Sequence, residues 1–263
     1  MKVAFMQTSP VFGEIEKNVD RAVARIGSLD ARLVVLPELF TTGYQFRSRK
    51  ELAGLAEDPV KGYAGTRLAE VARRKKIFIV AGFAERSGSK LYNSSMLVGP
   101  RGHIGLYRKA HLFSKEKKVF DPGDTPFKVY DIGPARIGMM ICFDWLFPEV
   151  SRELARKGAD IICHPSNLVL PYCPPAMITR SIENRVFTIT ANRVGVEERV
   201  EGARLRFIGK SQIIGPDGLT LARAPGRGQA AMVVDLEPKD ARKKRITPLN
   251  DVFKDLREDL LTL

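Results

Sequence analysis

The chain has 263 residues, of which 44% are hydrophobic and 28% are charged. This balance is typical of a folded globular protein and excludes an intrinsically disordered chain. The formal net charge of +13 makes a basic nucleic-acid-binding protein the main non-enzyme alternative, because clustered Lys and Arg neutralise phosphates. The basic residues stand in short groups among acids, however, which favours a solvated, salt-bridged surface without nucleic acid as a partner.

The start of the chain carries one lysine and no sustained apolar stretch, so no signal peptide is predicted and a cytoplasmic location is expected. The longest uncharged stretch, 161–179, contains four prolines and is predicted to be a strand followed by a loop, not a membrane span. The three cysteines lack CxxC spacing, which suits a reducing compartment. The three histidines are scattered, so no metal site is predicted.

Apolar runs rich in Val and Ile alternate with stretches of helical periodicity, which predicts strands covered by helices. In chain order, strands are predicted at 3–7, 32–37, 77–85, 93–100, 105–112, 127–132, 136–142, 159–164, 186–192, 208–215 and 219–224. Helices are predicted at 19–29, 65–75, 148–157 and 176–185. Turn residues join several neighbouring strands as hairpins, so antiparallel pairs mix with parallel crossovers. We therefore predict one α/β domain over 1–263, with 237–263 a charged tail that packs on a neighbouring subunit.

Cys142 closes the apolar run 136–141 and precedes Pro148 and Glu149, which suit the first turn of a helix. The thiol is therefore predicted at a strand-to-helix turn. Backbone N–H groups and the helix dipole there favour a thiolate and can donate to an oxyanion. Taken alone, such a cysteine is more often an inert core residue.

Two charged residues also follow apolar strands. Glu38 comes directly behind Pro37, where a carboxylate is costly to bury without a partner, and a desolvated carboxylate with a raised pKa can act as a general base. A helix or turn cap is its alternative role. Lys109 ends another strand, where an ammonium in a dry site can stabilise an oxyanion. A solvated lysine is the commoner outcome.

Together these segments resemble the three signature segments of the nitrilase superfamily of carbon-nitrogen hydrolases. They are Leu-Pro-Glu-Leu-Phe at 36–40, Tyr-Arg-Lys-Ala-His-Leu-Phe at 107–113 and Met-Ile-Cys-Phe-Asp-Trp at 140–145. Segments 120–124, 164–167 and 180–185 are similar to further family landmarks. The resemblance therefore covers essentially the whole chain.

The resemblance implies a four-layer α-β-β-α sandwich with two mixed sheets, paired as a homodimer through sheet-covering helices, without a metal or organic cofactor. It implies that Glu38 is the general base, that Lys109 stabilises the tetrahedral intermediate and that Cys142 attacks the substrate carbon. The family uses a second glutamate after the lysine. Glu116 is the only acid between Lys109 and Asp121, although three lysines surround it.

The expected reaction converts a small amide to a carboxylic acid and ammonia through a thioester on Cys142, with Lys109 and the Phe143 N–H holding the oxyanion. The Phe143-Asp144-Trp145 run looks closer to the amidase and carbamoylase branches than to long nitrilases. Small archaeal-type nitrilases also resemble this chain, so conversion of nitriles to acids is the second interpretation, and hydrolysis of N-carbamoyl amines is the third.

Side chains near the motifs are predicted to contact the substrate: Tyr44, Phe113, Phe143, Trp145, Asn167 and Tyr172. A Cys-His mechanism is the alternative chemistry, because His164 ends the strand after Cys142. Cys163 and Cys173 lie in no comparable motif and are expected to be structural.

Overall fold

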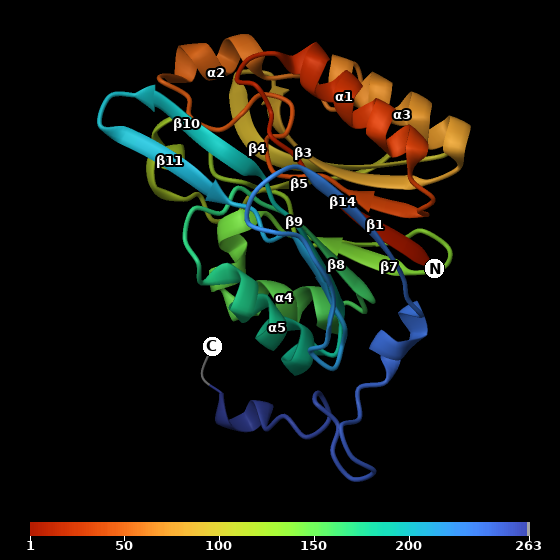
Figure 1. Ribbon diagram of the computed structural model, residues 1–263. Helices are drawn as coiled ribbons and strands as arrows, with labels where there is room; N and C mark the ends of the chain where they lie inside the picture. Colours follow the sequence, from red (N-terminus) through yellow and green to blue (C-terminus); the bar gives the residue numbers. More distant parts are fainter. Residues whose placement is uncertain (262–263) are drawn as a thin grey trace.

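Two six-stranded mixed sheets pack face to face in the computed structural model, which describes residues 1–261 (Figure 1). The first sheet has the order β14 (Ala230–Asp235), β1 (Lys2–Gln7), β2 (Leu33–Val35), β3 (Phe78–Ser87), β4 (Lys90–Gly99), β5 (Gly102–Arg108). The second has the order β13 (Thr220–Arg223), β12 (Gln212–Ile214), β9 (Phe187–Ala191), β8 (Ile161–Pro165), β7 (Arg136–Met139), β6 (Val129–Asp131). Strands β1 to β3 and β7 to β9 run parallel, and their neighbours pair antiparallel.

Helices cover the outer face of each sheet, which completes the expected four-layer α-β-β-α sandwich. Figure 1 shows α1 (Ile15–Ser28) and α3 (Tyr63–Lys75) over the first sheet, with α4 (Pro148–Arg156) and α5 (Cys173–Asn184) over the second. A further helix, α2 (Arg49–Leu55), lies beside the first layer. The 3-10 turns are η1 (Ser114–Lys118), η2 (Cys142–Leu146), η3 (Pro238–Arg242) and η4 (Glu258–Leu260).

The alternation of side chains along each strand explains the layering. In β1, Val3 and Phe5 belong to the hydrophobic cluster between the sheets, whereas Ala4 and Met6 belong to the cluster beneath α1 and α3. Because β1 is buried on both faces, its sequence reads as a continuous apolar run. The helical spacing of apolar residues in 19–26 is confirmed, since those side chains are the buried ones of α1.

The structure corrects several predicted boundaries. The helix predicted at 176–185 begins three residues earlier, because α5 starts at Cys173, where prolines at the first turn need no N–H donor. The predicted strand 208–215 begins only at Gln212, because Gly209 and Lys210 have φ values of 61° and 57°, a left-handed conformation that interrupts an extended strand.

A hairpin of β10 (Val194–Val200) and β11 (Ala203–Ile208), which the sequence did not predict, projects from the sandwich (Figure 1). The tail after β14 begins with η3, where Arg242 Nε and Nη2 donate to Asp160 at 3.0 and 2.9 Å and hold the start of the tail on the sandwich. Beyond it the tail runs below α4 and α5 (Figure 1), where the Phe253 ring lies 5.1 Å from the guanidinium of Arg152 and Glu258 pairs with Arg156. The predicted tail also includes residues 262–263, which lie outside the described residues.

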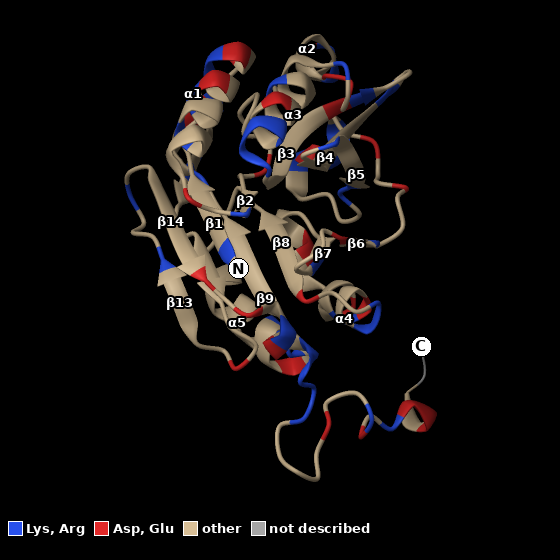
Figure 2. Ribbon diagram, turned by 90° about the vertical axis from the view of Figure 1, so that its right-hand side faces the viewer, with Lys and Arg blue, Asp and Glu red and all other residues tan. Residues whose placement is uncertain are grey.

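Basic and acidic residues are interspersed over the helices and loops (Figure 2). Ion pairs join many of them, such as Arg67 of α3 with Asp20 of α1 and with Glu70 of its own helix. This is the salt-bridged surface that the sequence suggested. No helix within residues 1–261 is long and apolar enough to cross a membrane.

Candidate active site

Glu38, Lys109 and Cys142 lie just beyond the carboxyl ends of strands from both sheets. Glu38 follows β2 after two residues, Lys109 follows β5 directly, and Cys142 begins η2 beyond β7. All three are buried, with exposed fractions of 0%, 1% and 7%. The ends of parallel strands in α/β sheets are where ligand sites commonly form.

The Lys109 ammonium bridges two carboxylates. Its Nζ donates to Glu38 Oε1 at 2.7 Å and to both carboxylate oxygens of Glu116 at 2.8 Å. Asn93 Nδ2 donates to the same Glu38 oxygen at 2.7 Å, and the Tyr44 hydroxyl donates to Glu116 Oε1 at 2.6 Å. Glu38 Oε2 is buried and accepts no hydrogen bond from the described residues. One oxygen of Glu38 is thus fixed, and the other is free to take a proton.

Burial and neighbouring charges set the proton affinities of these groups. Burial alone would lower the pKa of Lys109, but Glu116 and Glu38 outweigh it and raise that pKa, so the ammonium stays charged. Burial raises the pKa of Glu38. The negative charge of Glu116 also raises this pKa, and the positive charge of Lys109 opposes the shift. Burial and the Glu38 charge raise the pKa of the Cys142 thiol well above its usual value, opposed by Lys109 and by the Asn167 backbone N–H. The resting thiol is therefore neutral and needs a base.

The turn that carries Cys142 is held by its own hydrogen bonds. Cys142 has φ of 41°, a left-handed conformation that costs on the order of 1–3 kcal/mol for a residue with a side chain. The buried carboxylate of Asp144 accepts from the Ile141 N–H and the Tyr107 hydroxyl, both at 2.8 Å. His111 Nδ1 lies 2.8 Å from its second oxygen. Asp144 thereby fixes the backbone of the turn that carries Cys142.

His164 contacts the backbone carbonyl of Cys142 and not its thiol. Its Nε2 lies 2.9 Å from the Cys142 carbonyl oxygen, and its Nδ1 lies 3.1 Å from Thr190 Oγ1. Both ring nitrogens are therefore occupied away from the thiol. Burial lowers the pKa of His164 to about 4, so the ring is neutral at neutral pH. This geometry disfavours the Cys-His alternative.

Three of the aromatic side chains that were predicted to contact substrate gather beside the buried charges. Tyr44 touches Glu116, Phe113 borders the same glutamate, and the Phe113 and Phe143 rings lie 5.1 Å apart. Trp145 is partly buried against the large hydrophobic cluster, with its carbonyl oxygen accepting from Arg180 of α5, and Tyr172 is 62% exposed at the start of α5.

Asn167 is the other predicted contact that the structure places near Cys142. Its side chain is 3% exposed, and neither its amide nitrogen nor its amide oxygen has a partner among the described residues. A buried amide without partners is costly, which suggests that a ligand satisfies it. Cys163 and Cys173 are buried in β8 and at the start of α5.

Several residues of the site were not found from the sequence. Asn93 holds Glu38 and has no distinctive local pattern, and Asp144 holds the Cys142 turn, a role that its place in the 140–145 segment did not reveal. Glu197 accepts from the Tyr44 N–H at 3.1 Å and the Gln45 N–H at 2.6 Å, and Arg193 Nη1 donates to it at 2.6 Å. The Arg193–Glu197 ion pair therefore holds the backbone of Tyr44 in place. Glu197 belongs to the β10–β11 hairpin, which was not predicted from the sequence.

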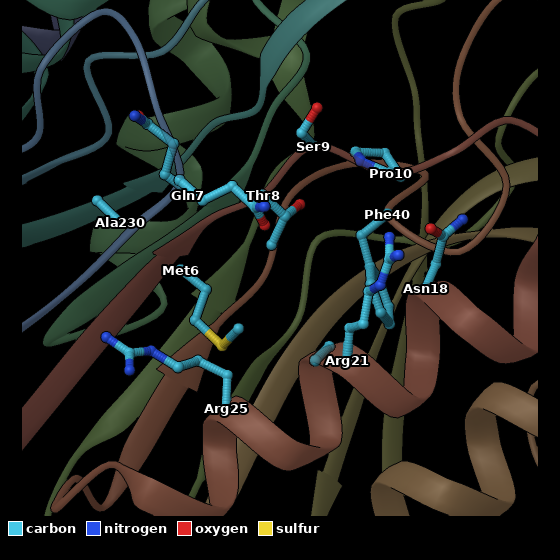
Figure 3. Close-up of a pocket in the computed structure, with 12 residues that line it drawn as sticks. Met6, Gln7, Thr8, Ser9, Pro10, Asn18, Arg21, Arg25, Phe40 and Ala230 are labelled. Carbon is cyan, nitrogen blue, oxygen red and sulfur yellow. The ribbon is translucent and has the colours of Figure 1, made fainter.

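Several cavities lie around these elements. The one in Figure 3 has a volume of about 320 Å³, lies beside α1 and β1 with Arg21 and Arg25 on its wall, and includes none of the three central residues. A second, of about 130 Å³, has Tyr44, Phe113 and Glu116 in its wall. No cluster of three or more His, Cys, Asp or Glu suited to a metal ion occurs in the described part of the chain.

Comparisons with known proteins identify sequence relatives and similar solved structures. The sequence profile of the carbon-nitrogen hydrolase family matches residues 2–246. The chain is 49% identical to a nitrilase from Pyrococcus abyssi, with 98% of each chain covered, and 36% identical to an (R)-stereoselective amidase from a Pseudomonas species, with 90% of this chain and 85% of the relative covered. A solved mutant amidase from Nesterenkonia sp. AN1 in complex with acrylamide superposes with a TM-score of 0.79 at 26% identity, covering 99% of this chain and 95% of that one.

Proposed function

This chain belongs to the carbon-nitrogen hydrolase family, and from that premise we propose that it hydrolyses small amides through a thioester on Cys142. The observation that carries the proposal is the buried Lys109 ammonium, held between Glu38 and Glu116 at 2.7 and 2.8 Å next to a neutral thiol. Such an arrangement supplies a base, a fixed positive charge and a nucleophile within one dry site.

The proposed reaction begins when the free oxygen of Glu38 takes the thiol proton and the sulfur adds to the amide carbonyl carbon. The Lys109 ammonium and the Phe143 N–H hold the resulting oxyanion. Glu38 returns the proton to the nitrogen, the carbon-nitrogen bond breaks, and ammonia leaves a thioester. Water, deprotonated by Glu38, then adds to the thioester and releases the acid, which restores the thiol. Glu116 keeps Lys109 charged and in place.

Nitriles are the second candidate substrates, favoured by the 49% identity to a protein named nitrilase. The sulfur would add to the nitrile carbon while Glu38 protonates the nitrogen, giving a thioimidate. Water then adds, ammonia leaves, and the same thioester forms. Because both routes meet at this intermediate, one Glu-Lys-Cys site serves either substrate. The unpartnered amide of Asn167 supports a polar substrate group beside the nucleophile in both cases.

The proposal extends to assembly and location. We propose a homodimer formed through the α5 layer, because large apolar side chains are exposed there: Leu146, Leu170, Tyr172 and Ile182. The C-terminal tail would lie against the partner. Three free cysteines support a reducing compartment such as the cytoplasm.

Ammonia release from a panel of aliphatic amides, nitriles and N-carbamoyl amines tests the chemistry. We expect turnover of amides, a loss of more than about 1,000-fold in Cys142→Ala, and a loss of about 100- to 10,000-fold in Glu38→Gln. Cys163→Ala, which changes a buried cysteine in β8, should remain active. Hydroxylamine should intercept the thioester as a hydroxamate. Activity that survives Cys142→Ala would rule out the mechanism, and turnover of nitriles without amides would rule out amides as the substrate.

A further inference from the structure

A partly open cavity of about 130 Å³ lies under the β10–β11 hairpin, next to the buried charges. Its wall combines the segment 44–46, the region around η1 and the two hairpin strands. Eight of its twelve lining side chains are apolar or aromatic: Tyr44, Phe46, Phe113, Val119, Phe120, Val200, Ala203 and Leu205. A small apolar cavity of this kind, with a few convergent polar groups, is the usual form of a ligand pocket.

The cavity borders the buried charges at Glu116, although Glu38, Lys109 and Cys142 do not line it. Glu116 forms part of its wall, and the same carboxylate holds Lys109 at 2.8 Å and accepts from the Tyr44 hydroxyl at 2.6 Å. Phe113, another wall residue, packs 5.1 Å from the ring of Phe143, which follows the nucleophile in the chain. A substituent on a carbonyl carbon that is bound at Cys142 therefore has the cavity within reach on the Glu116 side.

The hairpin wall is held in place by hydrogen bonds to the segment 44–46. The Gln45 side chain donates to the Ala203 carbonyl oxygen and accepts from the Arg199 N–H. Arg199 Nη1 donates to the Gln45 carbonyl oxygen at 2.8 Å. Because these contacts tie the two sides of the cavity together, its size is set by the fold and does not depend on a mobile loop.

We infer that this cavity binds the acyl substituent of the substrate and selects an uncharged, apolar group no larger than about a phenyl ring. The inference rests on the proposed function and deepens it. An engineered apolar cavity of about 150 Å³ holds benzene, which sets the upper size. A carboxylate on the acyl chain would be desolvated beside Glu116, and the one lysine in the wall, Lys115, is exposed. The pocket therefore disfavours acidic acyl chains.

The test compares acetamide, isobutyramide, phenylacetamide and succinamic acid as substrates. Each buried methylene should raise kcat/KM roughly fourfold, so phenylacetamide should exceed acetamide by well over tenfold, and succinamic acid should be the poorest.

Ala203→Phe fills the cavity and should lower the ratio of phenylacetamide to acetamide kcat/KM at least about tenfold. Leu219→Phe, at a 62% exposed position outside the cavity, is the matched control and should leave the ratio unchanged.

Two outcomes would overturn the inference while leaving the proposed function intact: a ratio unaffected by Ala203→Phe, or a preference for succinamic acid. If Ala203→Phe does not fold, Leu205→Ala enlarges the cavity and should favour 4-methylphenylacetamide over phenylacetamide; an unchanged preference contradicts the assignment. Calorimetric binding of phenylacetamide to Cys142→Ala, compared with acetamide, reports on the cavity without turnover. Failure of the proposed function would appear separately, as wild-type protein that releases no ammonia from any amide or nitrile.

Discussion

At the scale of single residues, the site is defined by what each polar atom is bonded to. Lys109 has two carboxylates at hydrogen-bond distance, so its charge is secure in a buried position that would otherwise neutralise it. Glu38 has one oxygen bonded to Lys109 and Asn93, and its other oxygen has no partner within residues 1–261. Because burial raises its pKa, Glu38 binds a proton more readily than a solvated glutamate, which suits a group that must accept and return one.

His164 gives a prediction about stability. Its pKa is lowered from 6.5 to about 4 by burial, so between these values the unfolded chain binds more protons than the folded one. The free energy of unfolding should therefore fall as the pH drops from about 6.5 to about 4, by up to about 3 kcal/mol from this group. Denaturant unfolding at a series of pH values measures it. His164→Gln should flatten the slope in this window, and parallel profiles for the two proteins would contradict the prediction.

At the scale of elements, the apolar strands and amphipathic helices could be predicted because burial imposes their periodicity. Glu38, Lys109 and Cys142 could be located at strand ends, but their roles depended on the family resemblance, since each alone also suits a cap, a solvated cation or a core thiol. The β10–β11 hairpin could not be predicted in this way. Only three of its residues, Val194, Glu197 and Phe207, are buried, so its sequence lacks the pattern of a covered strand.

Strand β3 packs closely against the backbone of Glu38 at Gly82, so a side chain added there should disturb the site. A Cβ on Gly82 would lie 2.5 Å from the Glu38 Cα and 2.8 Å from the Pro37 carbonyl oxygen, and both are backbone atoms. Gly82→Ala should therefore displace Glu38, lower kcat/KM about 10- to 100-fold and cost about 1–3 kcal/mol of stability. Ammonia release and thermal unfolding measure both effects.

Gly54→Ala in α2 is the matched control, because a Cβ there meets nothing within 4 Å. It should leave activity unchanged and add up to about 1 kcal/mol of stability, since alanine is the better helix former. Wild-type activity in Gly82→Ala would show that the close contact does not position the base.

At the scale of the whole molecule, the two helical layers differ in what they expose. No large apolar side chain of α1 or α3 is exposed, whereas Ile182 of α5 is 40% exposed, with Leu170 and Tyr172 in the segment before this helix at 47% and 62%. The net charge of +13 does not explain why only the α5 layer exposes apolar side chains, because basic and acidic residues are interspersed over both helical layers (Figure 2). A second copy of the chain on the α5 layer would cover these side chains.

Ile182→Lys tests this assembly. In a symmetric dimer each substitution is made on both sides of the interface, so two buried lysines would face it, and desolvation and like-charge repulsion should dissociate the pair. Light scattering coupled to size exclusion should give twice the mass of one chain for the wild type and the mass of one chain for the variant. Val60→Lys, at a 54% exposed position between α2 and α3, should remain dimeric. A monomeric wild type, or a dimeric Ile182→Lys, would place the interface elsewhere or exclude it.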